Sequence, residues 1–176
     1  MRLDPACWRG RVPDSSRAGA SYGAGDLGTN QAVNVEDVSA NPTGPMHVGH
    51  VRGAVFGDAL ANLLEKVGYR VCREYYINDG GAQVDVLARP VYLRYLEAHD
   101  LSVDWPEGSY PGDYLIEVGE ALKSKVGDRY LDEDESVWLD EVRSFATEAM
   151  MDLIRADLKL LGVEMDTFFS EKSLYG

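Results

Sequence analysis

Apolar positions along the chain occur either in short β-branched runs or at helical spacing. Residues 33–38 predict a strand, and residues 69–77, rich in aromatic and β-branched side chains, predict a second strand. Residues 47–67 between them predict a helix that ends at Gly68. Its apolar stripe consists of Val51, Val55, Leu60, Leu63, Leu64 and Val67. Strand, helix and strand in this order predict a right-handed β-α-β unit with parallel strands.

The second half of the chain predicts helices joined by loops. Residues 83–98 predict a helix that Pro90 should kink or split. Its inward positions are Val84, Leu87, Val91, Tyr95 and Leu96. Further helices are predicted over 114–126 and, after an acidic run, over 137–161, and residues 163–169 predict a returning strand. The expected fold class is α/β, the first half of a nucleotide-binding fold with its ligand crevice at the carboxyl ends of the strands.

Charge and cysteine content narrow the functional classes. The formal net charge of −13 argues against a general nucleic-acid clamp, so we expect no DNA partner and only local contact with RNA. Cys7 and Cys72 form no Cys-x-x-Cys pair, and neither a disulfide framework nor a metal site is indicated. No apolar run suits a leader or a membrane span, so we expect a cytoplasmic location and no membrane partner.

The loop after the first predicted strand carries the most specific sequence, Ser-Ala-Asn-Pro-Thr-Gly-Pro-Met-His-Val-Gly-His over residues 39–50. His47 and His50 are one helical turn apart and project from the same face. The free amide N–H groups and the dipole of a helix N-terminus favour phosphate, and Gly49 leaves room for a flat ring to approach the backbone. The alternative is that both histidines only cap or pack the start of the helix.

This loop resembles the "HIGH" signature of class I aminoacyl-tRNA synthetases. The longer string over residues 33–50 resembles the arginyl family, the arginine–tRNA ligases, and the likeness continues through residues 52–60 and 75–83. A weaker likeness covers residues 168–176. The resemblance implies the first half of a Rossmann-like class I synthetase catalytic domain with a helical insertion.

The resemblance also divides the chain into four expected parts. Residues 1–32 are expected to be a linker or the tail of an N-terminal domain, and residues 33–98 the first β-α-β part of the catalytic domain. Residues 99–162 are then the helical insertion, and residues 163–176 the returning strand of a truncated catalytic domain.

The function implied by the resemblance is ATP-dependent activation of L-arginine and its ligation to tRNA(Arg), with Mg²⁺ accompanying ATP. The implied catalytic residues are His47 and His50. The ATP-binding residues are Pro45, His47, Gly49 and His50, and the arginine-binding residues are Glu36, Ser39, Ala40, Asn41 and His50. Asn78, Asp79 and Gln83 resemble a motif at the border of the active site.

Several of these residues also have a purely structural interpretation. Glu36 could be an exposed carboxylate at a strand end, Asn41 a turn cap, and Asn78, Asp79 and Gln83 a plain turn with a helix cap. A small nucleotidylyltransferase with a His-x-Gly-His loop and a non-catalytic ATP-binding remnant are the alternative functions.

The chain departs from the arginyl pattern at three places. Asp37 replaces an aromatic residue, and Gly44 stands where some arginyl enzymes carry a lysine. A loop of the Lys-Met-Ser-Lys-Ser type was not found. We therefore expect a fragment that is inactive alone, with tRNA contacts lying mainly outside it.

Overall fold

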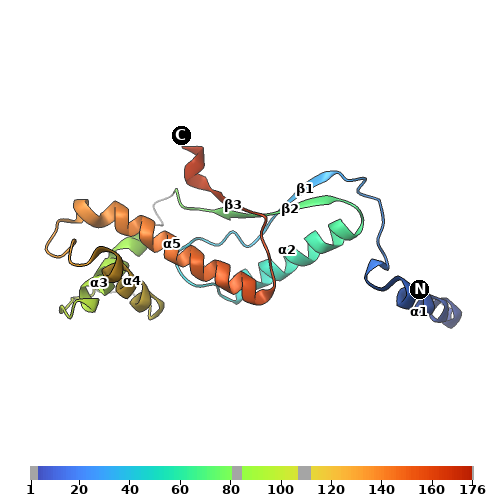
Figure 1. The fold of residues 1–176 in the computed structure, drawn as a ribbon, viewed down its shortest axis with the longest axis horizontal. Coiled ribbons are helices and arrows are strands. Elements are labelled where there is room, and N and C mark those ends of the chain that lie inside the picture. Colours follow the sequence, from blue (N-terminus) through green and yellow to red (C-terminus); the bar gives the residue numbers. More distant parts are fainter. Residues whose placement is uncertain (1–3, 81–84, 107–111, 176) are drawn as a thin grey trace.

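The computed structural model describes residues 4–80, 85–106 and 112–175. A three-stranded parallel sheet in the order β1-β2-β3 forms its centre, as the sequence predicts (Figure 1). The strands are β1 (Ala32–Glu36), β2 (Arg70–Ile77) and β3 (Thr167–Ser170). The helices are α1 (Pro5–Ala18), α2 (Val48–Lys66), α3 (Asp85–Ala98), α4 (Tyr114–Val126) and α5 (Glu135–Leu161), and the 3₁₀ turns are η1 (Gly19–Ser21) and η3 (Glu171–Leu174).

Helices α2 and α5 lie on the same side of the sheet (Figure 1). A buried cluster joins them to it: Ala54 from α2, Ile154 from α5 and Tyr75 from β2 pack together. The buried hydroxyl of Tyr75 donates a hydrogen bond to the carbonyl oxygen of Ala40 at 2.8 Å, and burial raises the pKa of Tyr75 to about 12. This bond ties the loop after β1 to the central strand.

The apolar stripe expected for α2 is only partly shielded. Val51, Leu64 and Val67 are half-buried, whereas Val55, Leu60 and Leu63 are exposed. The fully buried positions are the small residues Ala54, Gly57 and Ala61, so the helix is predicted correctly but its packing face only in part. Small residues let a helix lie close to a sheet, so the large apolar side chains point outward.

Helices α3, α4 and α5 enclose a second core, built around Tyr95, Tyr130 and Trp138. The helix α3 continues through Pro90, so of the two expected effects, a kink or a split, the split is wrong. The proline costs one backbone hydrogen bond, and the buried side chains of Leu87 and Val91 hold the helix against the core on either side of it.

The sequence pattern did not predict α1. None of its residues is buried, so it lacks the apolar periodicity on which the prediction depended. Its start is set locally, because Asp4 Oδ1 accepts a hydrogen bond from the amide of Ala6 at 2.7 Å and Pro5 occupies the first turn. No helix in the described part of the chain combines the length and apolar character that a membrane span requires.

Candidate active site

The two histidines of the His-x-Gly-His loop lie at the start of α2. His47 is the N-cap residue, and its Nδ1 accepts a hydrogen bond from the amide of Gly49 at 3.1 Å. His50 Nδ1 accepts from the amide of His47 at 3.4 Å. The two imidazole rings stack with centroids 3.7 Å apart and planes 17° from parallel. The Nδ1 atoms of both histidines therefore cap the helix, which is the alternative given for them above.

The Nδ1 contacts decide which ring nitrogen carries the proton. A neutral imidazole that accepts at Nδ1 must carry its proton at Nε2. Burial and the neighbouring His47 lower the pKa of His50, which keeps His50 neutral at neutral pH. The capping arrangement therefore leaves each neutral ring with an Nε2–H donor that no backbone contact of the cap uses.

The ring of His47 lies close over Gly49. A Cβ atom added to Gly49 would lie 3.0 Å from Cε1 of His47 and 3.1 Å from its Nδ1. We expected Gly49 to admit a flat ring, and the ring that lies against it in this structure is that of His47. His47 is exposed and His50 is half-buried, so neither imidazole lies in a hydrophobic core.

The loop between β1 and the histidines begins with strained backbone. Val38 and Ser39 have φ angles of 61° and 38°, the left-handed region that non-glycine residues seldom adopt. The amide of Ser39 donates to the carbonyl oxygen of Asp37 at 2.7 Å, and Ser39 Oγ accepts from the amide of Tyr76 at 3.0 Å. Hydrogen bonds to Asp37, the residue that follows β1, and to β2 thus hold Ser39 in the stretch expected to contact the amino acid.

The residues expected to bind arginine occupy different environments. Ala40 is buried, Ser39 is half-buried, and Glu36 and Asn41 are exposed. Val35 pairs with Arg73, whose side chain contacts α2, so strand alternation places Glu36 on the opposite face of the sheet. Glu36 therefore lies accessible at the carboxyl end of β1, where the loop to the histidines begins.

The contacts of Asp79 are structural. Asp79 Oδ2 accepts a hydrogen bond from Ser170 Oγ at 2.7 Å, and its Oδ1 accepts from the amide of Lys172 at 3.1 Å. Asp79 thus joins the end of β2 to the turn after β3, a long-range contact that neither the border role nor the local turn-and-cap alternative predicted. Asn78 is half-buried, Pro45 is exposed, and Gln83 lies outside the described residues.

Two contacts near the loop were not predicted. Tyr114, at the start of α4, donates its hydroxyl to the carbonyl oxygen of Thr43 at 3.3 Å. A Cβ atom at Gly44 would lie 3.2 Å from that hydroxyl, so α4 contacts the loop at the position where some arginyl enzymes carry lysine. Only the spatial arrangement brings Tyr114 and Thr43 together, and no spacing in the sequence indicates it.

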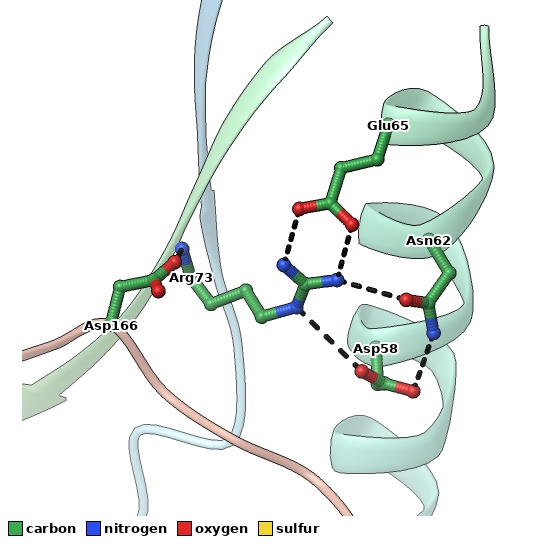
Figure 2. Close-up of polar contacts among 5 residues, drawn as sticks. All are labelled: Asp58, Asn62, Glu65, Arg73 and Asp166. Atoms are coloured by element: carbon green, nitrogen blue, oxygen red, sulfur yellow. Dashed lines mark hydrogen bonds and ion pairs between the residues drawn. The ribbon is translucent and has the colours of Figure 1, made fainter. Parts of the chain in front are cut away.

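Figure 2 shows an ion-pair cluster around Arg73 that the sequence pattern did not predict. Its guanidinium donates two hydrogen bonds to the carboxylate of Glu65, at 2.7 and 3.0 Å, in a bidentate contact. It also donates to Asn62 Oδ1 at 2.9 Å, and its Nε lies 3.7 Å from Asp58 Oδ1. The backbone amide of Arg73 donates to Asp166 at 2.8 Å. The spacing of Asp58, Asn62 and Glu65 along one face of α2 was the signal that could have found this cluster.

Asp37 lies beside this cluster, and one of its two carboxylate oxygens lacks a hydrogen bond. Its Oδ1 is buried and has no hydrogen-bond partner among the described residues. The carboxylate lies over Gly57, where a Cβ atom would be only 2.2 Å from it. Burial, and to a lesser degree the charge of Asp58, raise the pKa of Asp37 to about 6. The carboxylate that stands in place of an aromatic residue at position 37 therefore lies in a half-buried site with incomplete hydrogen bonding.

Comparisons with known proteins agree with this geometry. The family model described as "tRNA synthetases class I (R), catalytic domain" matches residues 18–108. The arginine–tRNA ligase of Ruegeria pomeroyi is 70% identical over all 176 residues, and that of Jannaschia sp. is 66% identical. The matches cover 100% of this chain but only 30% and 31% of those relatives, so the chain spans less than a third of their length.

A solved structure extends the agreement to three dimensions. The crystal structure described as an arginyl-tRNA synthetase from Campylobacter jejuni matches with a TM-score of 0.81 at 31% identity. The match covers 98% of this chain and 38% of that chain. The α/β fold class with a parallel sheet is therefore confirmed, and nothing in these comparisons favours a small nucleotidylyltransferase.

Proposed function

This chain belongs to the catalytic-domain family of class I tRNA synthetases (R), and from that premise we propose that it forms the ATP- and arginine-binding half of an arginine–tRNA ligase. The observation that carries the proposal is the pair of stacked imidazoles at the start of α2, each with its Nδ1 bound to backbone. In the proposed reaction a carboxylate oxygen of arginine bonds to the α-phosphorus of ATP, and the bond to pyrophosphate breaks. A hydroxyl of tRNA(Arg) then forms an ester bond to the arginyl carbonyl carbon of the resulting arginyl-adenylate, and AMP leaves.

His47 and His50 are proposed to stabilise the phosphate oxygens during this step. No nucleophile from the protein is needed, so the chain contributes positioning and charge stabilisation. Preorganised Nε2–H donors at a helix N-terminus suit both tasks, because they add to the field of the helix amides. Gly49 contributes by allowing the ring of His47 its position, and Pro45 contributes by limiting the freedom of the loop.

Glu36 is the proposed partner of the arginine guanidinium. A carboxylate can accept two parallel hydrogen bonds from a guanidinium, and the exposure of Glu36 at the end of β1 supports such a role. The main-chain groups of arginine would meet Ser39, Ala40 and Asn41. Asn78 and Gln83 remain proposed border residues, whereas Asp79 would support the site through its bonds to Ser170 and Lys172.

Binding of Mg²⁺ and of tRNA is not assigned to the described residues. These contain no group of three or more His, Cys, Asp or Glu side chains that could hold a metal ion, so Mg²⁺ would arrive bound to the phosphates of ATP. The tRNA contacts would come mainly from the polypeptide that the relatives have beyond the matched region. Charging of tRNA for translation places this proposed function in the cytoplasm.

Titration of the chain with ATP tests the role of the histidines. We expect His47→Gln and His50→Gln each to weaken ATP binding about five- to tenfold, the effect of losing one hydrogen bond to a charged group. Isothermal titration calorimetry or NMR line shifts would measure it. His99→Gln is the matched control, because His99 lies in the helical insertion with its ring against the carbonyl oxygen of Gly127. Equal affinity in all three variants would contradict the proposal.

A further inference from the structure

Tyr114 joins two parts of the molecule that lie 71 residues apart in the sequence. Its hydroxyl donates a hydrogen bond to the carbonyl oxygen of Thr43 at 3.3 Å. Thr43 lies in the loop between β1 and α2, four residues before His47. Helix α4 packs against α3 and lies away from the sheet (Figure 1). The hydrogen bond therefore connects the second core to the loop that leads into the histidines.

The donor end of this bond is anchored in the second core. The ring of Tyr114 packs against the buried cluster of that core, and the next residue, Leu115, is 1% exposed. A Cβ atom at Gly119 would lie only 2.6 Å from the backbone carbonyl carbon of Arg94 on α3, so α3 and α4 lie very close together. Helix α4 thus provides a fixed position from which the hydroxyl can hold a neighbouring loop.

Two glycines leave room for the side chain of Tyr114. A Cβ atom at Gly112 would overlap the ring, and a Cβ atom at Gly44 would lie 3.2 Å from the hydroxyl oxygen and 3.6 Å from Cζ. Gly44 does not have a positive φ, so its backbone conformation is open to other residues. The close approach of the hydroxyl is therefore what glycine accommodates at position 44.

The acceptor end of the bond lies in an exposed part of the loop. Ala40 is buried and Met46 packs against the core under the sheet, but Thr43 between them is exposed. A hydrogen bond removes conformations that an exposed segment would otherwise visit, and a loop that is already ordered pays less entropy when it binds a ligand. The hydroxyl of Tyr114 thus restricts the stretch that leads into His47.

We propose that Tyr114 is a positioning residue for the adenylation site, a role that rests on the function proposed above. Its hydroxyl fixes Thr43 and thereby keeps His47 in the orientation in which Nδ1 accepts from the amide of Gly49. In that orientation the Nε2–H of His47 is presented to a phosphate. Tyr114 itself touches no substrate. Loss of its hydroxyl lowers the population of the binding-competent loop, and the apparent affinity for ATP falls by the same factor.

Amide hydrogen exchange at Gly49, followed by NMR in the 176-residue chain without nucleotide, tests the positioning. Tyr114→Phe keeps the ring and removes only the hydroxyl. We expect exchange at Gly49 to become about three- to fivefold faster, the effect of losing one hydrogen bond of ordinary net strength. Equal exchange in Tyr114→Phe and in the unmodified chain would overturn the inference.

Tyr92→Phe is the matched control for this experiment. The hydroxyl of Tyr92 also donates to a carbonyl oxygen, that of Tyr130 at 2.9 Å, but this bond lies within the second core. Its removal should leave exchange at Gly49 unchanged. An equal acceleration in Tyr92→Phe would show that the loop responds to any loosening of the second core, and would also overturn the role of the Tyr114 hydroxyl.

Titration with ATP distinguishes this inference from the proposed function. Tyr114→Phe should weaken ATP binding about three- to fivefold in the unmodified background but less than about twofold in the His47→Gln background, because a positioning residue acts through the group that it positions. Equal losses in both backgrounds would contradict the inference. Faster exchange at Gly49 together with an ATP affinity that His47→Gln leaves unchanged would support the positioning of His47 by Tyr114 and count against the proposed function.

Discussion

At the scale of single residues, Asp37 has the clearest energetic consequence. A carboxyl group with a raised pKa binds its proton more tightly in the folded state than in the unfolded state. The pKa of Asp37 is about 6, against an ordinary value of 3.8. The contribution of this group to stability is therefore most favourable below the ordinary value and is lost as the pH rises through about 6.

We expect Asp37→Asn to stabilise the chain by about 1 kcal/mol at pH 7.5, because it removes a charge from a poorly hydrogen-bonded site. The gain should shrink as the pH falls from 6 to 4, since Asp37 itself becomes neutral in that window. Urea unfolding at a series of pH values measures the difference between the variant and the unmodified chain. Asp104→Asn, at an exposed position, is the control and should leave that difference near zero. A gain independent of pH would contradict the assignment.

The positions of His47 and His50 could be predicted from the sequence, but their hydrogen bonds could not. Strand, loop and helix follow from local patterns, and they place both residues at a helix N-terminus. Which nitrogen accepts a bond depends on ring rotation and on the fit of His47 against Gly49. The contacts of Asp79 with Ser170 and Lys172 could not be predicted from the sequence either, because they join parts of the chain about ninety residues apart.

At the scale of elements, periodicity located the helices better than it oriented them. The range of α4 matches its prediction, and α2, β2 and α5 differ only at their ends. Val55, Leu60 and Leu63 of α2 were assigned to the core because they are larger than the buried Ala54, Gly57 and Ala61. The helix α1 was missed because its residues are all outside a core, although Asp4 followed by Pro5 is a recognisable helix start.

The contact between α2 and β2 through Arg73 gives an element-scale prediction. Arg73 and Arg89 both hold a glutamate with two hydrogen bonds, but their side chains are 13% and 61% exposed. We expect Arg73→Gln to lower the free energy of unfolding by about 2 kcal/mol, because it leaves Glu65 and Asp58 without their cation. Arg89→Gln should cost about 0.5 kcal/mol or less. Thermal or urea unfolding measures both, and equal losses would refute the role of burial.

At the scale of the whole molecule, we propose that these 176 residues supply one half of an active site. The stacked histidines and Glu36 lie at the carboxyl ends of the described strands, the edge where doubly wound folds bind ligands. The lysine-bearing loop expected from the family pattern does not occur in the sequence. The chain covers about 30% of its relatives, so catalysis by the complete enzyme is expected to draw on residues outside it.

We expect the isolated chain to give no ATP–pyrophosphate exchange above background with arginine and tRNA, because the charge on the leaving pyrophosphate lacks its expected lysine. Radioactive exchange measures this sensitively. A chimera in which this chain replaces its matched region in the Ruegeria pomeroyi ligase is the positive control and should be active. Robust turnover by the pure 176-residue chain would show that the described residues suffice.

The stacking of His47 on His50 has a consequence for how the proposed site would respond to its ligand. A proton on either ring faces the other imidazole at 3.7 Å, and this proximity together with burial disfavours the cationic form of His50. A polyphosphate held beside the pair reverses that balance, because negative charge favours imidazolium. Nucleotide capture at this helix terminus would then be thermodynamically coupled to uptake of a hydrogen ion from the surrounding water in mildly acidic solution.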